Sequence, residues 1–137
     1  MKKFICISLV FLLIGTLFAF SQNIIQHIQM RCSSLVLDDG QEYSWMVSSV
    51  RLAIFDDSTT LIVFTFNNGN TTDYHLTNQR RLSNNQIQSD VVLRSGGQRI
   101  SGLTGLATES PGILLLSIYD GSISSANLVA RMTLRTN

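Results

Sequence analysis

Apolar and polar residues alternate over two long stretches of this chain. In residues 128–135 the apolar set at every second position is Leu128, Ala130, Met132 and Leu134. Residues 28–36 alternate in the same way, and their apolar set is Ile28, Met30, Cys32 and Val36. Side chains of a β-strand point alternately to opposite faces, whereas a helix repeats about every 3.6 residues. Both stretches therefore predict strands with one buried face.

Two other segments, 59–66 and 113–119, are almost continuously apolar and rich in residues that favour strands. Runs of this kind are typical of strands whose two faces are both at least partly covered. We therefore expect these two segments to lie centrally, with apolar neighbours on each side.

Short turn sequences separate the expected strands. Four pairs suit tight hairpins of the primed types, which need positive φ: Asp39-Gly40, Asn68-Gly69, Gly96-Gly97 and Asp120-Gly121. Residues 56–58, residues 78–85 and the loop around Pro111 supply three more connections. The strands between them are 23–37, 41–55, 59–66, 70–77, 86–94, 98–107, 113–119 and 126–135.

Eight strands with short connections and no candidate crossover helix predict an all-β domain built as one antiparallel meander. A meander hides its edge strands by closing into a barrel or by splitting into two packed sheets. Eight strands suit a small up-and-down, lipocalin-like barrel, and a two-sheet β-sandwich is the alternative. The Gly-x-Trp sequence of true lipocalins is absent, because Tyr43-Ser44 precedes Trp45. The lipocalin comparison therefore concerns architecture only.

The start of the chain predicts export. Two lysines precede an apolar run from Phe4 to Phe20, and the small residues Ala19 and Ser21 fit a cleavage site for signal peptidase. We expect residues 1–21 to be a signal peptide and residues 22–137 to be a single secreted or periplasmic domain. An uncleaved membrane anchor is the alternative. After cleavage no membrane span is expected.

Removal of the signal peptide changes the charge and the cysteine count. Both lysines belong to the signal, so residues 22–137 carry eight arginines against nine acidic residues. Such a chain supplies no general field for a phosphate backbone, and nucleic acid is not an expected partner. Cys32 is then the one remaining cysteine, which excludes a disulfide within the monomer. We expect it to pack as a small apolar side chain, with an intermolecular disulfide or a nucleophilic thiol as the alternatives.

Candidate chemistry is sparse. Asp73 and His75 would project from the same face of a strand, but two ligands do not make a metal site, and we interpret them as a solvent-facing polar stripe. Arg80 and Arg81, in the expected loop 78–85, form the only local basic cluster. We interpret the pair as solvated, and contact with a carboxylate or phosphate is the alternative. No metal or cofactor is expected.

Trp45 allows two interpretations. On the inner face it would anchor the core or plug one end of a barrel, and this is the prediction we favour. On the outer face, together with Tyr43, it would form a contact site of the kind that aromatic residues make in protein interfaces.

These observations predict a secreted or periplasmic binding module that is not an enzyme. Its ligand would be a small apolar molecule, a glycan or a protein partner, and an open cavity of about 300 Å³ or more would support the first of these. The candidate contact residues are Tyr43, Trp45, Asp73, His75, Arg80 and Arg81. A structural or assembly protein of the cell envelope is one alternative. An exported hydrolase that uses Asp73, His75 or Cys32 is another, although these residues form at most loose pairs.

Overall fold

The structure is a computed structural model that describes residues 24–136. The predicted signal peptide, residues 1–21, lies outside this range. The elements in chain order are β1 (Ile24–Leu37), η1 (Ser44–Met46), β2 (Val47–Phe55), β3 (Thr60–Phe66), β4 (Thr71–Arg81), β5 (Gln86–Ser95), β6 (Gln98–Ser110), β7 (Ile113–Asp120), η2 (Ser125–Asn127) and β8 (Leu128–Thr136). Within the described range, no helix is long and apolar enough to cross a membrane.

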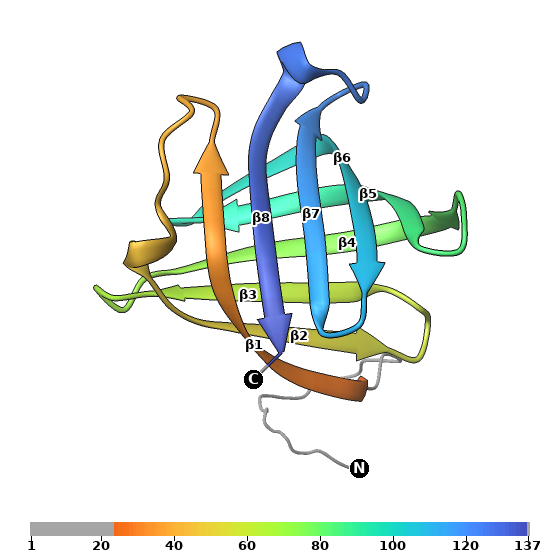
Figure 1. The fold of residues 1–137 in the computed structure, drawn as a ribbon, viewed down its shortest axis with the longest axis horizontal. Coiled ribbons are helices and arrows are strands. Elements are labelled where there is room, and N and C mark those ends of the chain that lie inside the picture. Colours follow the sequence, from red (N-terminus) through yellow and green to blue (C-terminus); the bar gives the residue numbers. More distant parts are fainter. Residues whose placement is uncertain (1–23, 137) are drawn as a thin grey trace.

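The eight strands form a closed antiparallel barrel. Each strand pairs with the next one along the chain, and β1 also pairs with β8. In the view of Figure 1, β1, β7 and β8 cross in front of β2 to β5. The hydrogen-bonded ladder is nevertheless continuous around the whole circle. This confirms the predicted meander barrel and excludes the alternative of two separate sheets.

Strand β1 closes the barrel because it bends and pairs on both sides. Its first half, residues 24–30, pairs with β2, and its second half, residues 30–37, pairs with β8. The register with β8 shifts between Cys32 and Ser34, which marks a β-bulge. An extra residue in one strand reverses the alternation beyond it, so Leu35 is buried and Val36 is not. The prediction that Val36 shares the apolar face was wrong for this reason.

Strand β8 follows its predicted pattern except at its start. The buried residues are Ala130, Met132 and Leu134. Arg131 is exposed, as expected. The ladder with β7 skips Val129, which packs against the core, whereas Leu128 does not belong to the core. The prediction that Leu128 is buried with the others was wrong because of this second bulge.

Each of the two continuous apolar runs has one fully covered face, and its other face is only partly covered. In β3 and β7 the alternate residues point into the barrel, and their neighbours lie on the outer wall. Leu115 on that wall is 44% exposed, and Leu61 and Val63 are partly exposed. A closed barrel has a single interior, so its outer face is not covered by a second layer.

Four strand boundaries lie two or more residues from the predicted ones, and one of them is the end of β6, at Ser110 instead of residue 107. The short helices η1 and η2 replace the expected first residues of β2 and β8. Strand β4 continues to Arg81 instead of ending at residue 77, because the chain passes through a bulge at Asn78. Asn78 adopts a left-handed conformation with φ of 50°, which asparagine tolerates better than most residues.

The predicted glycine turns are all at the ends of strands, but only one has the geometry of a type I′ turn. Gly96 and Gly97 both have positive φ, as that turn requires. In the other three pairs only the glycine has positive φ. The sequence therefore predicted where these chain reversals lie, but it predicted the turn type at one of the four.

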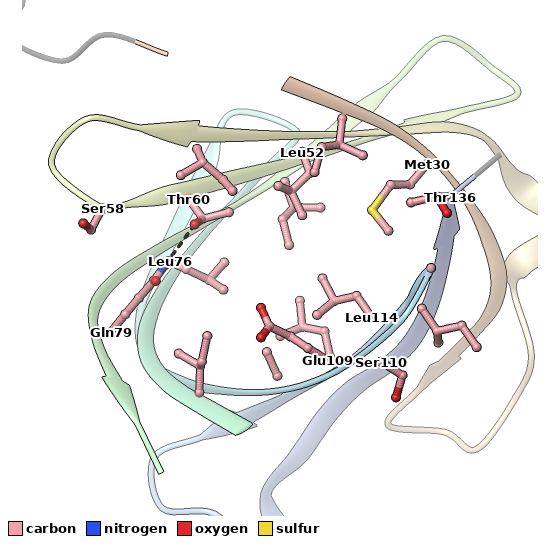
Figure 2. A pocket seen from close by; sticks show the side chains of 18 of the residues that line it. Met30, Leu52, Ser58, Thr60, Leu76, Gln79, Glu109, Ser110, Leu114 and Thr136 are labelled. Atoms are coloured by element: carbon pink, nitrogen blue, oxygen red, sulfur yellow. Dashed lines mark hydrogen bonds between the residues drawn. The ribbon is translucent and has the colours of Figure 1, made fainter. Parts of the chain in front are cut away.

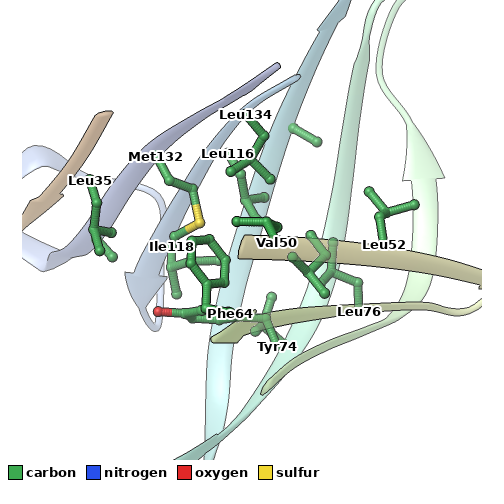
Figure 3. Close-up of a cluster of buried hydrophobic side chains, with 14 of the residues drawn as sticks. Leu35, Val50, Leu52, Phe64, Tyr74, Leu76, Leu116, Ile118, Met132 and Leu134 are labelled. Carbon is green, nitrogen blue, oxygen red and sulfur yellow. The ribbon is translucent and has the colours of Figure 1, made fainter. Parts of the chain in front are cut away.

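The hydrophobic core lies toward the end of the barrel that carries residues 38–46, 67–70, 96–97 and 121–127, here called the filled end. Phe64 packs edge-to-face on Tyr74 with ring centroids 5.6 Å apart, beside Met132 and Ile118 (Figure 3). The strands approach closely here. A Cβ atom on Gly105 of β6 would lie 2.8 Å from a Val91 methyl carbon, so this interior position requires glycine.

Candidate functional site

A cavity of about 530 Å³ occupies the opposite end of the barrel. This open end is bounded by the connections 56–59, 82–85 and 111–112, together with the first residues of β1 and the last of β8. Figure 2 shows side chains from around the barrel pointing into one common space. The cavity is therefore the interior of the barrel itself, continued past the packed core.

The wall of the cavity is mostly aliphatic. Its deeper part includes Leu52, Ile62, Leu76 and Leu116, which are all buried. Ile28 and Leu114, nearer the mouth, are partly buried. The same period-two alternation that builds the core brings these side chains inward, because residues at every second position of a strand share a face.

Six polar side chains interrupt this wall: Ser58, Thr60, Gln79, Glu109, Ser110 and Thr136. The Gln79 side-chain amide donates a hydrogen bond to the Thr60 hydroxyl at 2.9 Å. Glu109 is the one charged residue that lines the cavity, and Figure 2 shows its carboxylate directed into it. The mouth of the cavity therefore offers several hydrogen-bonding groups around an apolar interior.

Arg81 lies beside Glu109 without neutralising it tightly. The closest nitrogen and oxygen of the pair are 3.6 Å apart, and both side chains are about half exposed. The Arg81 guanidinium also donates to the backbone carbonyl of Asn84 at 2.9 Å, which directs it toward the connecting loop. An exposed ion pair of this kind contributes only ~0–1 kcal/mol. The Glu109 carboxylate therefore keeps acceptor capacity for a ligand.

Glu109 was missed at the level of sequence because the strand was expected to end at residue 107. In the structure β6 continues to Ser110, so the inward face carries Gly105, Ala107 and Glu109 in turn. Ala107 lines the cavity with a small side chain, and the acidic residue follows at the mouth. Extending the alternation by two residues would have placed Glu109 on the inner face.

The two neighbouring arginines were predicted to lie in a loop. In the structure they are the last two residues of β4. Arg81 pairs with Ile87, a residue of the cavity wall, and reaches Glu109. Arg80 pairs with Gln88 and is exposed. Both side chains are exposed, as the interpretation of a solvated pair expects, but they form no joint site because adjacent residues in a strand point to opposite faces.

Asp73 and His75 lie on the outer wall, alternating with the buried residues Tyr74 and Leu76. The predicted polar stripe therefore lies outside the barrel and neither residue lines the cavity, but both side chains are partly buried and do not face solvent freely. Partial burial raises the pKa of Asp73. Partial burial, assisted by the charge of Arg94, lowers the pKa of His75. His75 is therefore neutral near pH 7.

We predicted that Trp45 is a core residue. This was wrong, because the residue is 71% exposed. It belongs to η1, whose short helical turn lies outside the strand pattern that would have turned the ring inward. Its indole nitrogen donates to the carbonyl of Glu42 at 3.2 Å, and its own carbonyl accepts from the Asn67 side chain at 2.9 Å. Tyr43, partly buried beside it, donates to the Asp39 carboxylate. The exposed ring is thus held by defined contacts at the filled end.

Glu42 fixes the connection between β1 and β2, a role that the sequence did not indicate. Its carboxylate accepts hydrogen bonds from the backbone amides of Leu35 and Ser44 at 2.8 and 2.9 Å, and from the Ser34 hydroxyl at 2.9 Å. These bonds stabilise the charged form and lower the pKa of Glu42 from 4.5 to about 2.

Cys32 is partly buried and packs against the core, as expected of a small apolar side chain. Its thiol donates to the Ser34 carbonyl at 3.2 Å. Burial raises the pKa of the thiol to about 11, so little thiolate exists near neutral pH. In this environment Cys32 is a poor nucleophile.

The predicted polar residues do not converge on one site. Across residues 24–136, no three His, Cys, Asp or Glu side chains lie close enough to hold a metal ion. Asp73 and His75 are outside the barrel, Trp45 and Tyr43 are at the filled end, and Arg81 alone reaches the cavity mouth. Comparisons of the chain with protein-family models, curated proteins and solved structures give no match.

Proposed function

We propose that the protein is an exported β-barrel that binds a small, mainly apolar molecule in the cavity at its open end and catalyses no reaction. The cavity carries this proposal. Its volume of about 530 Å³ falls in the range of roughly 300–1,000 Å³ that is typical of small-molecule sites. Its aliphatic wall and few polar groups are also typical of such sites.

The polar groups at the mouth favour one orientation and one class of ligand. The apolar part of the ligand would lie against the aliphatic wall. This contact contributes about 25 cal/mol of binding free energy for each Å² of apolar surface removed from water. Its polar part would meet Glu109, Gln79 and Thr60. A carboxylate only accepts hydrogen bonds and repels an anion, so Glu109 favours a hydroxyl or amine head group over an acid.

A non-enzymatic role is supported by the positions of the candidate nucleophile and bases. The Cys32 thiol is held protonated by burial, with its pKa raised to about 11. His75 and Asp73 lie on the outer wall and not in the cavity. A nucleophile requires a base within hydrogen-bond reach, and these residues do not supply one to the cavity. Export rests on the sequence of residues 1–21.

Displacement of an apolar fluorophore tests the proposal. We expect N-phenyl-1-naphthylamine to bind the protein with enhanced fluorescence, and dodecanol to displace it better than dodecanoate. Ala107→Phe, which places a ring in the cavity, should weaken binding by about tenfold or more. Thr108→Phe adds the same ring to the next residue, on the outer face, and should leave binding unchanged. Equal binding by both variants would contradict the cavity site.

A second candidate, contact with another protein of the cell envelope, is favoured by the exposed ring of Trp45. Aromatic residues of this kind often anchor interfaces. Every strand of the described range has a partner on both sides, so such a contact would use side chains of η1 and not strand addition. Trp45→Ala separates the two candidates, because it should abolish a protein contact and leave fluorophore binding unchanged.

A further inference from the structure

A second, polar pocket of about 220 Å³ lies on the outer wall near the filled end. Three charged residues on adjacent strands line it: Asp73 of β4, Arg94 of β5 and Arg99 of β6. The type I′ turn at Gly96 and Gly97, which joins β5 to β6, forms one side of the pocket. This site is separate from the cavity inside the barrel, since the two have no lining residue in common.

The strand register brings the three charges together. Asp73 pairs with Arg94, and Arg94 pairs in turn with Arg99. Directly opposed residues on antiparallel strands have Cβ atoms about 4.5–5.5 Å apart. Alternation places the three on the outer face, since Thr72 and Tyr74, which flank Asp73, are both buried. The row is therefore one continuous charged surface across three strands.

The charges of this row are not satisfied within the described chain. Two arginines directly opposite each other repel, which is unfavourable for the pairing of β5 with β6. No group within residues 24–136 donates a hydrogen bond to the partly buried Asp73 carboxylate, and it forms no ion pair with Arg94 within 4.0 Å. Burial raises the pKa of Asp73 although the charge of Arg94 opposes this. Arg94 and Arg99 are exposed and Asp73 is partly buried, so a ligand that replaces solvent can reach all three charges.

We propose that this pocket binds a carboxylate ligand that carries a hydroxyl group next to the carboxylate. Two guanidinium groups offer parallel N–H donors that match the oxygens of a carboxylate. Asp73 accepts a hydrogen bond from the neighbouring hydroxyl, which compensates for its burial. The pocket is smaller than a typical site for a drug-sized molecule, so it fits one acid unit. Free α-hydroxy acids such as lactate and gluconate have this arrangement, whereas in a uronic acid unit the carbon next to the carboxylate carries the ring oxygen, which cannot donate a hydrogen bond.

Calorimetric titration of the full chain with four probes tests the proposal. Lactate and gluconate contain both groups, propionate lacks the hydroxyl, and galactose lacks the carboxylate. We expect lactate to bind at least about fivefold more tightly than propionate, and galactose not to bind. Gluconate binding much more tightly than lactate would assign the site to sugar acids, and the reverse order to short hydroxy acids.

Three variants assign the binding to the pocket. Arg94→Gln and Arg99→Gln should each weaken binding of the acids by about tenfold. Asp73→Asn should reduce the preference for lactate over propionate and leave propionate binding equal or stronger. Arg80→Gln is the matched control, because it removes an exposed arginine of β4 that lines neither pocket. Thermal melts of each variant establish that the barrel remains folded.

Two results would overturn the proposal. One is that neither lactate nor gluconate binds the folded protein at millimolar concentration. The other is that binding survives in the folded Arg94→Gln, Arg99→Gln double variant. Neither result bears on the cavity, since fluorophore displacement measures the other end of the barrel.

Discussion

The two ends of the barrel are built from the same eight strands, but one end is packed and the other contains a cavity. At the filled end, large side chains such as Phe64, Tyr74 and Met132 meet across the interior. At the open end, the inward positions carry aliphatic side chains and Ala107, and a volume of about 530 Å³ remains between them. An eight-stranded barrel is only just wide enough for side chains to fill. The size of a few inward residues therefore decides whether a given cross-section of the barrel is packed core or binding site.

The largest expected effect comes from a charge at the filled end. Met132→Asp should unfold the domain, because Met132 is fully buried and an unpaired carboxylate there costs about 4–5 kcal/mol or more, comparable with the stability of a small domain. Arg131→Asp on the outer face of the same strand should change stability by less than about 0.5 kcal/mol. Circular dichroism and thermal melts measure both. Equal tolerance of the two changes would contradict the assignment of inner and outer faces.

An identical substitution at each end compares the two directly. Ala130 and Ala107 both face inward, but Ala130 lies within the packed core and Ala107 also lines the cavity. Ala130→Phe overfills the core and should cost about 3 kcal/mol, whereas Ala107→Phe should cost less than about 1 kcal/mol because its ring enters open space. Denaturant unfolding gives both free energies. Similar losses would mean that the open end is as tightly packed as the filled end in solution.

The smallest effect concerns pH and is confined to the filled end. The Glu42 pKa is lowered from 4.5 to about 2, so its hydrogen bonds stabilise the folded state above pH 4.5 and this contribution is lost as the pH falls toward 2. Glu42→Gln should lower the Tm by a few degrees at pH 7 and make the decline between pH 4.5 and 2 less steep. Asp38→Asn, in the same connection, is the control, because Asp38 accepts no side-chain hydrogen bond within the described range. Parallel pH profiles for the wild type and Glu42→Gln would contradict the role of Glu42.

Alternation and turn sequences were sufficient to predict the barrel, because both are local properties of the chain. They failed where one extra residue enters a strand. The bulges next to Ser34 and Val129 exchange the inward residue with its neighbour, and the bulge at Asn78 extends β4 beyond its predicted end. Nothing in the local composition of these segments marks the extra residue, since it is accommodated by the partner strand.

The candidate cavity was harder to predict than the fold. Its wall is contributed by residues spread along the whole described chain, and none of them belongs to a recognisable motif. A cavity is also defined by what side chains leave unfilled, and this depends on the size of inward residues such as Ala107 relative to those opposite them. The prediction that Trp45 lies in the core failed for a different reason. Trp45 is the type of residue that is usually well buried, but a single helical turn places it on the surface.

The pairing of β1 with β8 also has a consequence for how the chain reaches its folded state. All other neighbouring strands are adjacent in sequence and can form as hairpins, but this ladder joins residues about a hundred positions apart, as in the contact of Ser33 with Thr133. Contacts of such long range are slow to form, because the entropy of a large loop must be lost first. Until β8 docks, the partly folded sheet has two unpaired edges that can recruit strands from other molecules. The last ladder to close is therefore the one that removes the risk of aggregation.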